Sequence, residues 1–237
     1  MSDLQVTLVE RRQEFDGHLA FATALDRRLI EGDTISIGEM ALTARHLLTI
    51  KSGLIVHLYN VVEATMTKVI DEIGKEVLAI PPAQWSRITV KEWLRHYAAI
   101  GVDGNEDSRL DVVHGAALKL LARQPIQTLK FKKPSGTWSD KVILEFSRRL
   151  GVNFPLNAQI APRIQASPKY RDLTPLEFLA DRRNAIAHGR RTFENGANDL
   201  TLPDIAELAS ITLDYLVLAV SAFEHYITQK QFRTADA

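Results

Sequence analysis

Cysteine is absent from this chain of 237 residues. Its absence excludes disulfide bonds, thiolate zinc sites and cysteine nucleophiles, and it fits a reducing compartment. The chain also lacks an excess of charge of either sign, because 29 lysines and arginines balance 29 aspartates and glutamates. A protein that coats DNA regardless of sequence needs a strong positive field. The balance argues against that class but leaves room for a local basic site.

Signals for membrane insertion are also lacking. Residues 1–4 do not begin the positive and then apolar stretch of a signal peptide. The most apolar segment, residues 216–223, is shorter than the roughly 20 residues that a membrane span needs. We therefore expect a buried core helix there, and a soluble, cytoplasmic protein with no membrane partner.

Metal and cofactor motifs are missing as well. The seven histidines show no ligand spacing, and the chain has no HExxH, Walker or GxGxxG motif. Residues 101–107 carry glycines and acids but lack the spacing and the terminal glutamate of an EF-hand calcium loop, so we interpret them as a turn. We expect no metal and no cofactor.

Apolar residues at helical spacing dominate both ends of the chain. They predict helices over about residues 4–30 and 38–76, and again over about 174–188 and 201–228. Thr174, Pro175 and Glu177 provide an N-cap, a first-turn proline and a capping box for the third of these helices. Gly189 provides its C-terminal stop.

The middle of the chain, about residues 77–172, is broken by prolines and has a different pattern. We expect short helices over about 90–99, opened by a Thr89…Glu92 capping box, and over 107–123 and 141–150, with a strand at 126–131, a turn at 134–136 and loops at 153–169. We interpret this stretch as an insertion. The predicted fold is a single all-α domain, residues 1–237, with core helices at about 4–76 and 173–229 and a partly α+β insertion.

The end of the third long helix carries the residues with the clearest chemistry. At about 100° per residue, Arg183 falls within the apolar face of the helix, whereas Asn184 and His188 share a polar flank. An arginine on an apolar face either pairs with an acid or faces a pocket or a partner. Spacing alone favours the structural interpretation, an Arg–Glu pair, for example with Glu63, and a histidine near a helix C-terminus.

The stretch from Arg183 and Asn184 to His188 and Gly189 nevertheless resembles the Arg–polar–x–x–x–His signature of HEPN proteins, in its RN-x-x-AHG form. It stands where that superfamily places it, at the end of the penultimate core helix. Residues 15–29 and 54–73, with a YN-x-x-E stretch at 59–63, resemble the first two helices of a bacterial toxin-like HEPN branch. Residues 134–136 followed by 141–151 also resemble that branch, less specifically. The resemblance therefore covers nearly the whole chain and implies a HEPN-like helical bundle.

The resemblance implies metal-independent cleavage of RNA to 2′,3′-cyclic phosphate and 5′-OH ends. His188 can transfer protons at neutral pH, since an unperturbed imidazole titrates near pH 6.5. Arg183 can hold phosphate oxygens with two donors, and Asn184 can orient the scissile group or His188. DNA lacks the 2′-OH nucleophile, so this chemistry selects RNA.

HEPN proteins commonly form homodimers in which two motifs face each other, which would place Arg183 in the dimer cleft and create a composite active site. Glu63 and Asn60 would form a supporting layer around that site. For Glu63 a buried salt bridge with Arg182 or Arg183 is an equally weighted alternative. We expect Tyr59 to be a core residue with a satisfied hydroxyl, not a platform for stacking bases.

RNA also needs an electropositive path to the site. Arg190 and Arg191 directly follow the motif and are the best candidates. Basic residues interleaved with Phe131 and Trp138 suit single-stranded RNA, and Lys132 and Lys133 are RNA-binding candidates within that group. A solvated surface is the favoured interpretation for most of its basic members, which are Lys130, Lys132, Lys133, Lys141, Arg148 and Arg149.

The first functional hypothesis is an endoribonuclease toxin of a toxin–antitoxin or phage-defence system, with RNA as substrate and an antitoxin or defence protein as partner. The second is a catalytically silent HEPN module that binds RNA, nucleotide or a partner protein. The third is a helical scaffold whose motif is coincidental. The joint presence of Arg183, Asn184 and His188 favours the nuclease.

Overall fold

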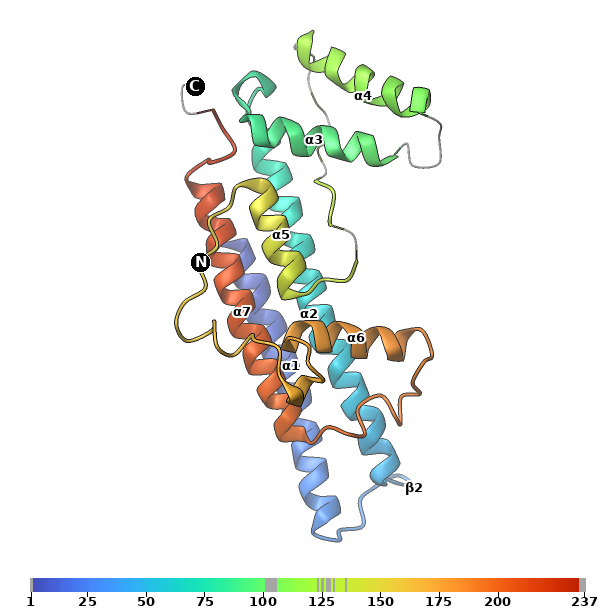
Figure 1. Ribbon diagram of the computed structural model, residues 1–237. Helices are drawn as coiled ribbons and strands as arrows, with labels where there is room; N and C mark the ends of the chain where they lie inside the picture. The colour runs from blue at the N-terminus through green and yellow to red at the C-terminus, as the bar shows by residue number, and fades with distance from the viewer. Residues whose placement is uncertain are drawn as a thin grey trace. The chain divides into compact units, whose positions relative to one another are not determined.

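Helices dominate the computed structural model, which describes residues 2–100, 106–122, 124, 126, 129, 131–134 and 136–234 (Figure 1). They account for 67% of the structure, and the described residues form one small sheet, which confirms the all-α fold class. The elements in chain order are α1 (Asp3–Ile30), β1 (Ser36–Ile37), β2 (Met40–Ala41), α2 (Ala44–Leu78), η1 (Pro82–Gln84), α3 (Arg87–Ile100), α4 (Glu106–Leu121), α5 (Asp140–Leu150), η3 (Pro168–Tyr170), α6 (Pro175–Ala187) and α7 (Leu202–Thr228).

The chain forms two compact units, each built from segments that are distant in the sequence. Unit 1 comprises Met1–Thr65, Thr137–Asp140 and Leu156–Leu218, and unit 2 comprises Met66–Gly136, Lys141–Pro155 and Ala219–Ala237. Both α2 and α7 contribute to each unit. One domain with an insertion over about residues 77–172 stays a prediction.

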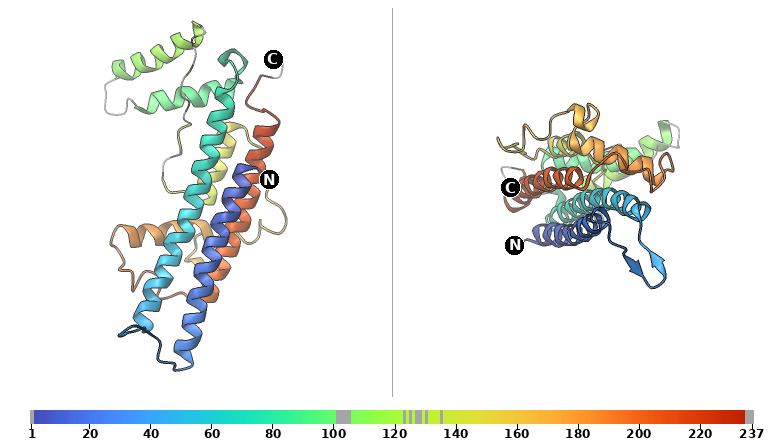
Figure 2. Two further views of the ribbon diagram at one scale, coloured as in Figure 1. Left: turned by 180° about the vertical axis from the view of Figure 1, so that it is seen from behind. Right: turned by 90° about the horizontal axis from the view of Figure 1, so that it is seen from below.

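In unit 1, α1 runs antiparallel to the neighbouring parts of α2 and α7, and α6 crosses these helices (Figures 1 and 2). Phe15 of α1, Leu58 of α2 and Tyr215 of α7 are completely buried in the core of this unit. Burial of large side chains of this kind contributes about 1.5–3 kcal/mol each. The stacked helices therefore provide a rigid base for α6.

The ends of α6 form as the sequence predicts. The Thr174 hydroxyl accepts the N–H of Glu177, and the Glu177 carboxylate accepts the N–H of Thr174, so the predicted capping box is present. At the other end Gly189 has φ +71°, a conformation that glycine adopts without steric cost, and the helix stops there.

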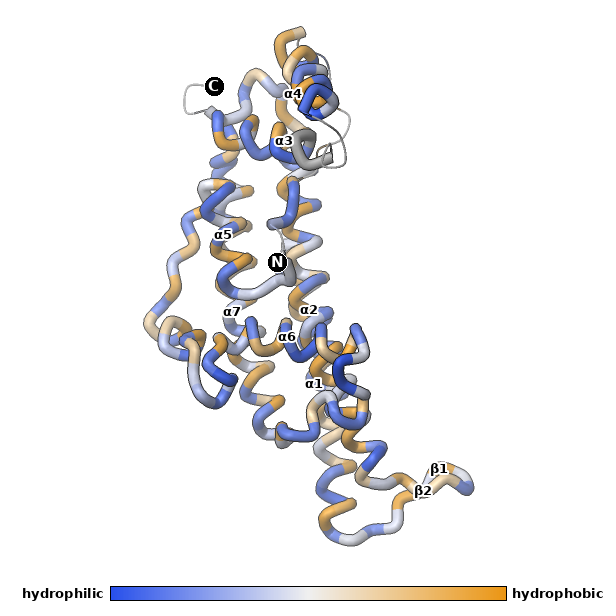
Figure 3. Tube along the Cα trace, turned by 45° about the vertical axis from the view of Figure 1, so that its right-hand side comes forward, coloured by the Kyte–Doolittle hydropathy of each residue, from blue (hydrophilic) through white to orange (hydrophobic). Residues whose placement is uncertain are grey.

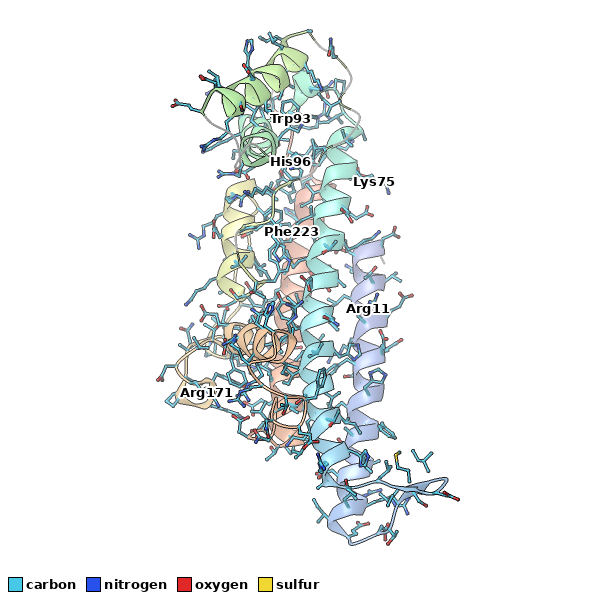
Figure 4. The ribbon with its side chains drawn as sticks, turned by 90° about the vertical axis from the view of Figure 1, so that its right-hand side faces the viewer. Arg11, Lys75, Trp93, His96, Arg171 and Phe223 are labelled. Carbon is cyan, nitrogen blue, oxygen red and sulfur yellow. The ribbon has the colours of Figure 1, made fainter. Side chains whose placement is uncertain are left out.

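In unit 2, α5 packs on the C-terminal part of α7, where the rings of Phe146 and Phe223 lie 5.8 Å apart (Phe223 is labelled in Figure 4). The predicted Thr89…Glu92 capping box is wrong. Helix α3 begins at Arg87, and the hydroxyl of Ser86 accepts the N–H of Thr89. Glu92 is instead buried and accepts hydrogen bonds from two arginines, Arg95 at 3.0 Å and Arg149 at 2.6 Å.

Two other predicted boundaries also differ from the structure. Helix α2 begins at Ala44 and not near residue 38, because a β1–β2 hairpin turns at Gly38, which has φ +60°. The hairpin carries hydrophobic residues (Figure 3), and Ile37 and Met40 among them are exposed. The expected strand at 126–131 is absent at the described residues 126, 129 and 131. Ser135 of the predicted turn, Lys130 and residues 101–105 of the other turn lie outside the described residues.

Helix α7 matches the helix predicted over about residues 201–228 and contains the apolar segment 216–223. By length and composition alone it could cross a membrane, with a mean hydropathy of 1.6 over its most apolar 18 residues. However, 61% of that window is buried within the protein, including Leu216 and Val220. This burial is that of a core helix, as expected.

Candidate active site

The three motif residues stand at the C-terminal end of α6, in unit 1. Arg183 and Asn184 belong to the last turns of the helix, and His188 is its C-cap residue. The N–H of His188 donates to the Asn184 carbonyl at 3.0 Å, and the N–H of Gly189 donates to the Ile186 carbonyl at 3.1 Å. These bonds close the helix and fix the backbone that carries the motif.

The guanidinium of Arg183 is held on three sides. Nη2 donates to Glu63 Oε2 at 2.9 Å, and Nη1 donates to Asn184 Oδ1 at 3.1 Å. The Arg183 Cζ also lies 4.5 Å from the centre of the Tyr59 ring, a cation–π contact. The side chain nevertheless keeps 24% of its surface exposed, so it is oriented but still reachable.

This geometry settles which arginine Glu63 contacts. Glu63 pairs with Arg183, as one alternative predicted, and not with Arg182. The pair is not buried, because 41% of the Glu63 side chain is exposed. Glu63 therefore orients Arg183 at the surface.

The amide of Asn184 connects Arg183 to another part of the chain. Its Oδ1 accepts from Arg183, and its Nδ2 donates to the hydroxyl of Thr137 at 2.9 Å. The amide thus faces Arg183, whereas the sequence suggested that it orients the scissile group or His188. No periodicity or motif in the sequence pointed to Thr137, which enters the site only through folding.

His188 differs from Arg183 in having an exposed and unrestrained side chain. None of the described residues forms a hydrogen bond with its imidazole ring. Both ring nitrogens are accordingly available to a substrate or to a second protein chain.

Tyr59 is a core residue, as expected. It is 1% exposed, and its hydroxyl accepts the backbone N–H of Trp138 at 3.0 Å. Burial raises the pKa of the Tyr59 phenol, so it stays protonated at neutral pH and is unsuited to act as a base. Its ring supports Arg183 and is not accessible to stack on a base.

The profile of the HEPN_MAE_28990-like HEPN family matches residues 2–232. The chain belongs to this HEPN family. HEPN domains are nuclease and RNA-binding modules, often ribonucleases, and they commonly dimerise. No curated protein and no solved structure shows a significant match to the chain.

Arg182, which immediately precedes the HEPN motif, is a structural residue. It is 2% exposed and donates to both carboxylate oxygens of Asp199, and its Nη1 also donates to the Gly196 carbonyl at 2.9 Å. Arg171, labelled in Figure 4, donates to the same carboxylate at 2.8 Å. The hydrogen bond from Arg182 is the main cause that holds the pKa of Asp199 well below its usual range. Asp199 therefore ties the loop before α7 to α6.

The two arginines after the HEPN motif are already paired with protein groups. Arg190 contacts Asp181 at 3.3 Å, and both side chains are exposed. Arg191 donates to the Asn195 carbonyl at 2.9 Å and lies 3.7 Å from Asp199. A phosphate would have to compete with these acceptors.

The other basic candidates belong to unit 2, whereas the HEPN motif belongs to unit 1. Lys132 is exposed and Lys133 is half-buried. The aromatic residues interleaved with the basic residues in the sequence are not accessible to RNA, because Phe131 is 3% and Trp138 2% exposed. Both rings pack in the interior.

Asn60 lies away from the HEPN motif residues. It is exposed and lines a groove of about 440 Å³ between α1 and α2, together with His18, Phe21 and His57. No hydrogen bond joins Asn60 to Arg183, Asn184 or His188 among the described residues. Its supporting role stays a prediction.

The different roles of the adjacent arginines can be tested by stability. Arg182→Ala should lower the free energy of unfolding by about 3 kcal/mol, because it removes a buried charge from its partner and orphans the Gly196 carbonyl. Arg183→Ala removes a half-exposed pair and should cost about 1 kcal/mol or less. Urea unfolding followed by circular dichroism measures both, with Arg190→Ala as an exposed control. Equal losses for Arg182→Ala and Arg183→Ala would contradict the assignment.

The lowered pKa of Asp199 also predicts that the stability of the fold depends on pH. Because its pKa is lower in the folded state than in the unfolded chain, the unfolded state binds more protons, and stability is lost as pH falls below about 4. Asp199→Asn should flatten the fall in unfolding temperature between pH 5 and pH 3, whereas the exposed control Asp181→Asn should not. An unchanged slope in Asp199→Asn would refute this source of acid sensitivity.

Proposed function

We propose that this HEPN protein is a metal-independent endoribonuclease that leaves 2′,3′-cyclic phosphate and 5′-OH ends. The observation that carries the proposal is that one helix end presents both a histidine without hydrogen bonds to the described residues and an arginine held in place at the surface. His188 supplies an imidazole that can accept or donate a proton, and Arg183 supplies a fixed positive charge.

The chemistry assigns each residue a step. The 2′-oxygen of RNA attacks the adjacent phosphorus as its proton leaves, and the bond from phosphorus to the 5′-oxygen breaks as that oxygen gains a proton. His188 transfers protons, and Arg183 stabilises the charge that develops on the phosphate oxygens. A guanidinium has five N–H donors, of which Glu63 and Asn184 engage two, so others remain for phosphate.

One helix end offers a single histidine for two proton transfers. A homodimer in which two motifs meet would supply a second histidine, which is our reason to propose a composite site. RNA would reach it along Arg190 and Arg191, whose contacts with phosphate would replace their pairs with Asp181 and Asp199. Lys132 and Lys133 are proposed as further RNA-binding residues.

The proposed setting is a toxin–antitoxin or phage-defence system in the cytoplasm, with an antitoxin or defence protein as partner. It is supported by the resemblance of the helices to the toxin-like HEPN branch. The second candidate is a catalytically silent module that binds RNA, nucleotide or a protein. It is favoured by one observation, that Arg182, Arg183, Arg190 and Arg191 all pair with acids of the same unit.

The nuclease proposal is tested with purified protein, total cellular RNA and excess EDTA. Wild type should cut the RNA, and His188→Ala and Arg183→Ala should each cut it about 100-fold more slowly or worse. His225→Ala, which removes another exposed histidine in the last turn of a helix, should cut normally. Cyclic-phosphate ends should be present in the wild-type products.

Equal cutting by all four proteins would point to another site or a contaminant. A folded wild-type dimer that binds RNA but leaves it intact would favour the silent module.

The composite site is tested by mixing wild type with the His188→Ala variant. If one site needs His188 of both copies, a dimer of one wild-type and one His188→Ala chain should cut about 100-fold more slowly than the wild-type dimer, as the His188→Ala homodimer does. Native mass spectrometry checks that mixed dimers form. Mixed dimers that keep about half of the wild-type cutting would mean that each site uses the histidine of one chain only.

A further inference from the structure

The short segment Thr137–Asp140 is tied to three helices of unit 1. The N–H of Trp138 donates to the Tyr59 hydroxyl of α2 at 3.0 Å. The Thr174 hydroxyl at the start of α6 donates to Asp140 Oδ1 at 2.6 Å, and the Tyr215 hydroxyl of α7 donates to the Asp140 carbonyl at 3.0 Å. Trp138, Ser139 and Asp140 are all buried. The segment is therefore a fixed part of the scaffold, and so is the hydroxyl of Thr137 at its start.

That hydroxyl contacts the amide of Asn184. The orientation of this amide decides whether its oxygen or its NH₂ group faces Arg183. An arginine only donates hydrogen bonds, so Arg183 requires the oxygen of the amide and not its NH₂ group. With Oδ1 toward Arg183, the Nδ2 group needs an acceptor on its other side, and Thr137 Oγ1 lies there at 2.9 Å. A rotation of the amide by 180° would put donor against donor at Arg183.

We propose that Thr137 is a positioning residue of the active site, which fixes the Asn184 amide so that its oxygen holds the Arg183 guanidinium over the Tyr59 ring. This inference rests on the proposed nuclease function. Asn184 then acts through Arg183, because its amide joins Arg183 to Thr137. Glu63 holds the other terminal nitrogen of Arg183.

Loss of the Thr137 hydroxyl has a distinct kinetic consequence. Arg183 keeps its charge and its bond to Glu63, so RNA still binds. The guanidinium loses the restraint on Nη1, however, and is less well placed when charge develops on the phosphate. An interaction that matters mainly in the transition state affects kcat and leaves KM nearly unchanged.

The test compares Thr137→Val, which keeps the shape but removes the acceptor, with Thr137→Ser, which keeps the hydroxyl. Thr137→Val should lower kcat about 10-fold to 100-fold with KM within about twofold, and Thr137→Ser should stay close to wild type. Thr212→Val removes the hydroxyl of a buried threonine of unit 1 that has no hydrogen-bond partner among the described residues, and it should not change kcat.

A second readout does not depend on activity. The side-chain NH₂ signals of Asn184, identified by their loss in Asn184→Ala, should shift in Thr137→Val but not in Thr137→Ser. Wild-type kcat in Thr137→Val, an equal loss in Thr137→Ser, or unmoved Asn184 signals would each overturn the assignment. An inactive wild type whose Asn184 signals shift in Thr137→Val would refute the nuclease and retain the positioning of the amide.

Discussion

The ion pair between Arg182 and Asp199 is the contact on which the arrangement of the motif depends. Helix α6 ends at the protein surface, at the exposed His188, and a loop then connects it to α7. Arg182 is buried and engages both oxygens of Asp199 and the carbonyl of Gly196, so the loop is tied to the helix from within. A buried charge without partners is very costly, so Arg182 needs the acceptors of the loop. This need fixes where the loop lies against the helix. Gly196 fits closely here, because a Cβ at that residue would lie 2.5 Å from the Ser52 hydroxyl and 2.7 Å from the Ile186 side chain.

Helix geometry explains why two adjacent arginines have opposite roles. Successive residues of a helix point about 100° apart, so Arg182 can face the interior while Arg183 faces the edge of α2. The sequence offered a structural ion pair and a functional arginine as competing interpretations of Arg183. In the folded chain the arginine that is buried in a structural pair is Arg182, and Arg183 is both paired with Glu63 and partly exposed. An exposed pair can orient a cation without removing it from solvent, which suits a residue that must still receive an anion.

The features that the sequence predicted well are those with local causes. The all-α class, the capping box at Thr174 and the stop at Gly189 all follow from residues within a few positions of one another. A pair between Glu63 and Arg183, 120 residues apart, was one of the predicted alternatives, but other features that join distant segments were missed. Glu92 has the spacing of a capping box but pairs with Arg149, 57 residues away, and Thr137 meets Asn184 across 47 residues. Composition likewise could not show that Phe131 and Trp138 point inward. Local patterns therefore located the motif, and the fold added the contacts by which Asn184 and Tyr59 hold its arginine.

The two charged groups of the proposed reaction are prepared to different degrees. Arg183 is fixed by Glu63, by Asn184 and by the Tyr59 ring, and these contacts are complete within one chain. The imidazole of His188 has no such support from the described residues. Proton transfer needs a defined distance and direction between the histidine and the reacting oxygen. In the proposed mechanism that definition must come from outside the chain, from the RNA or from a second copy. In that mechanism folding builds the arginine side of the site, and the RNA or a second copy of the chain completes the histidine side.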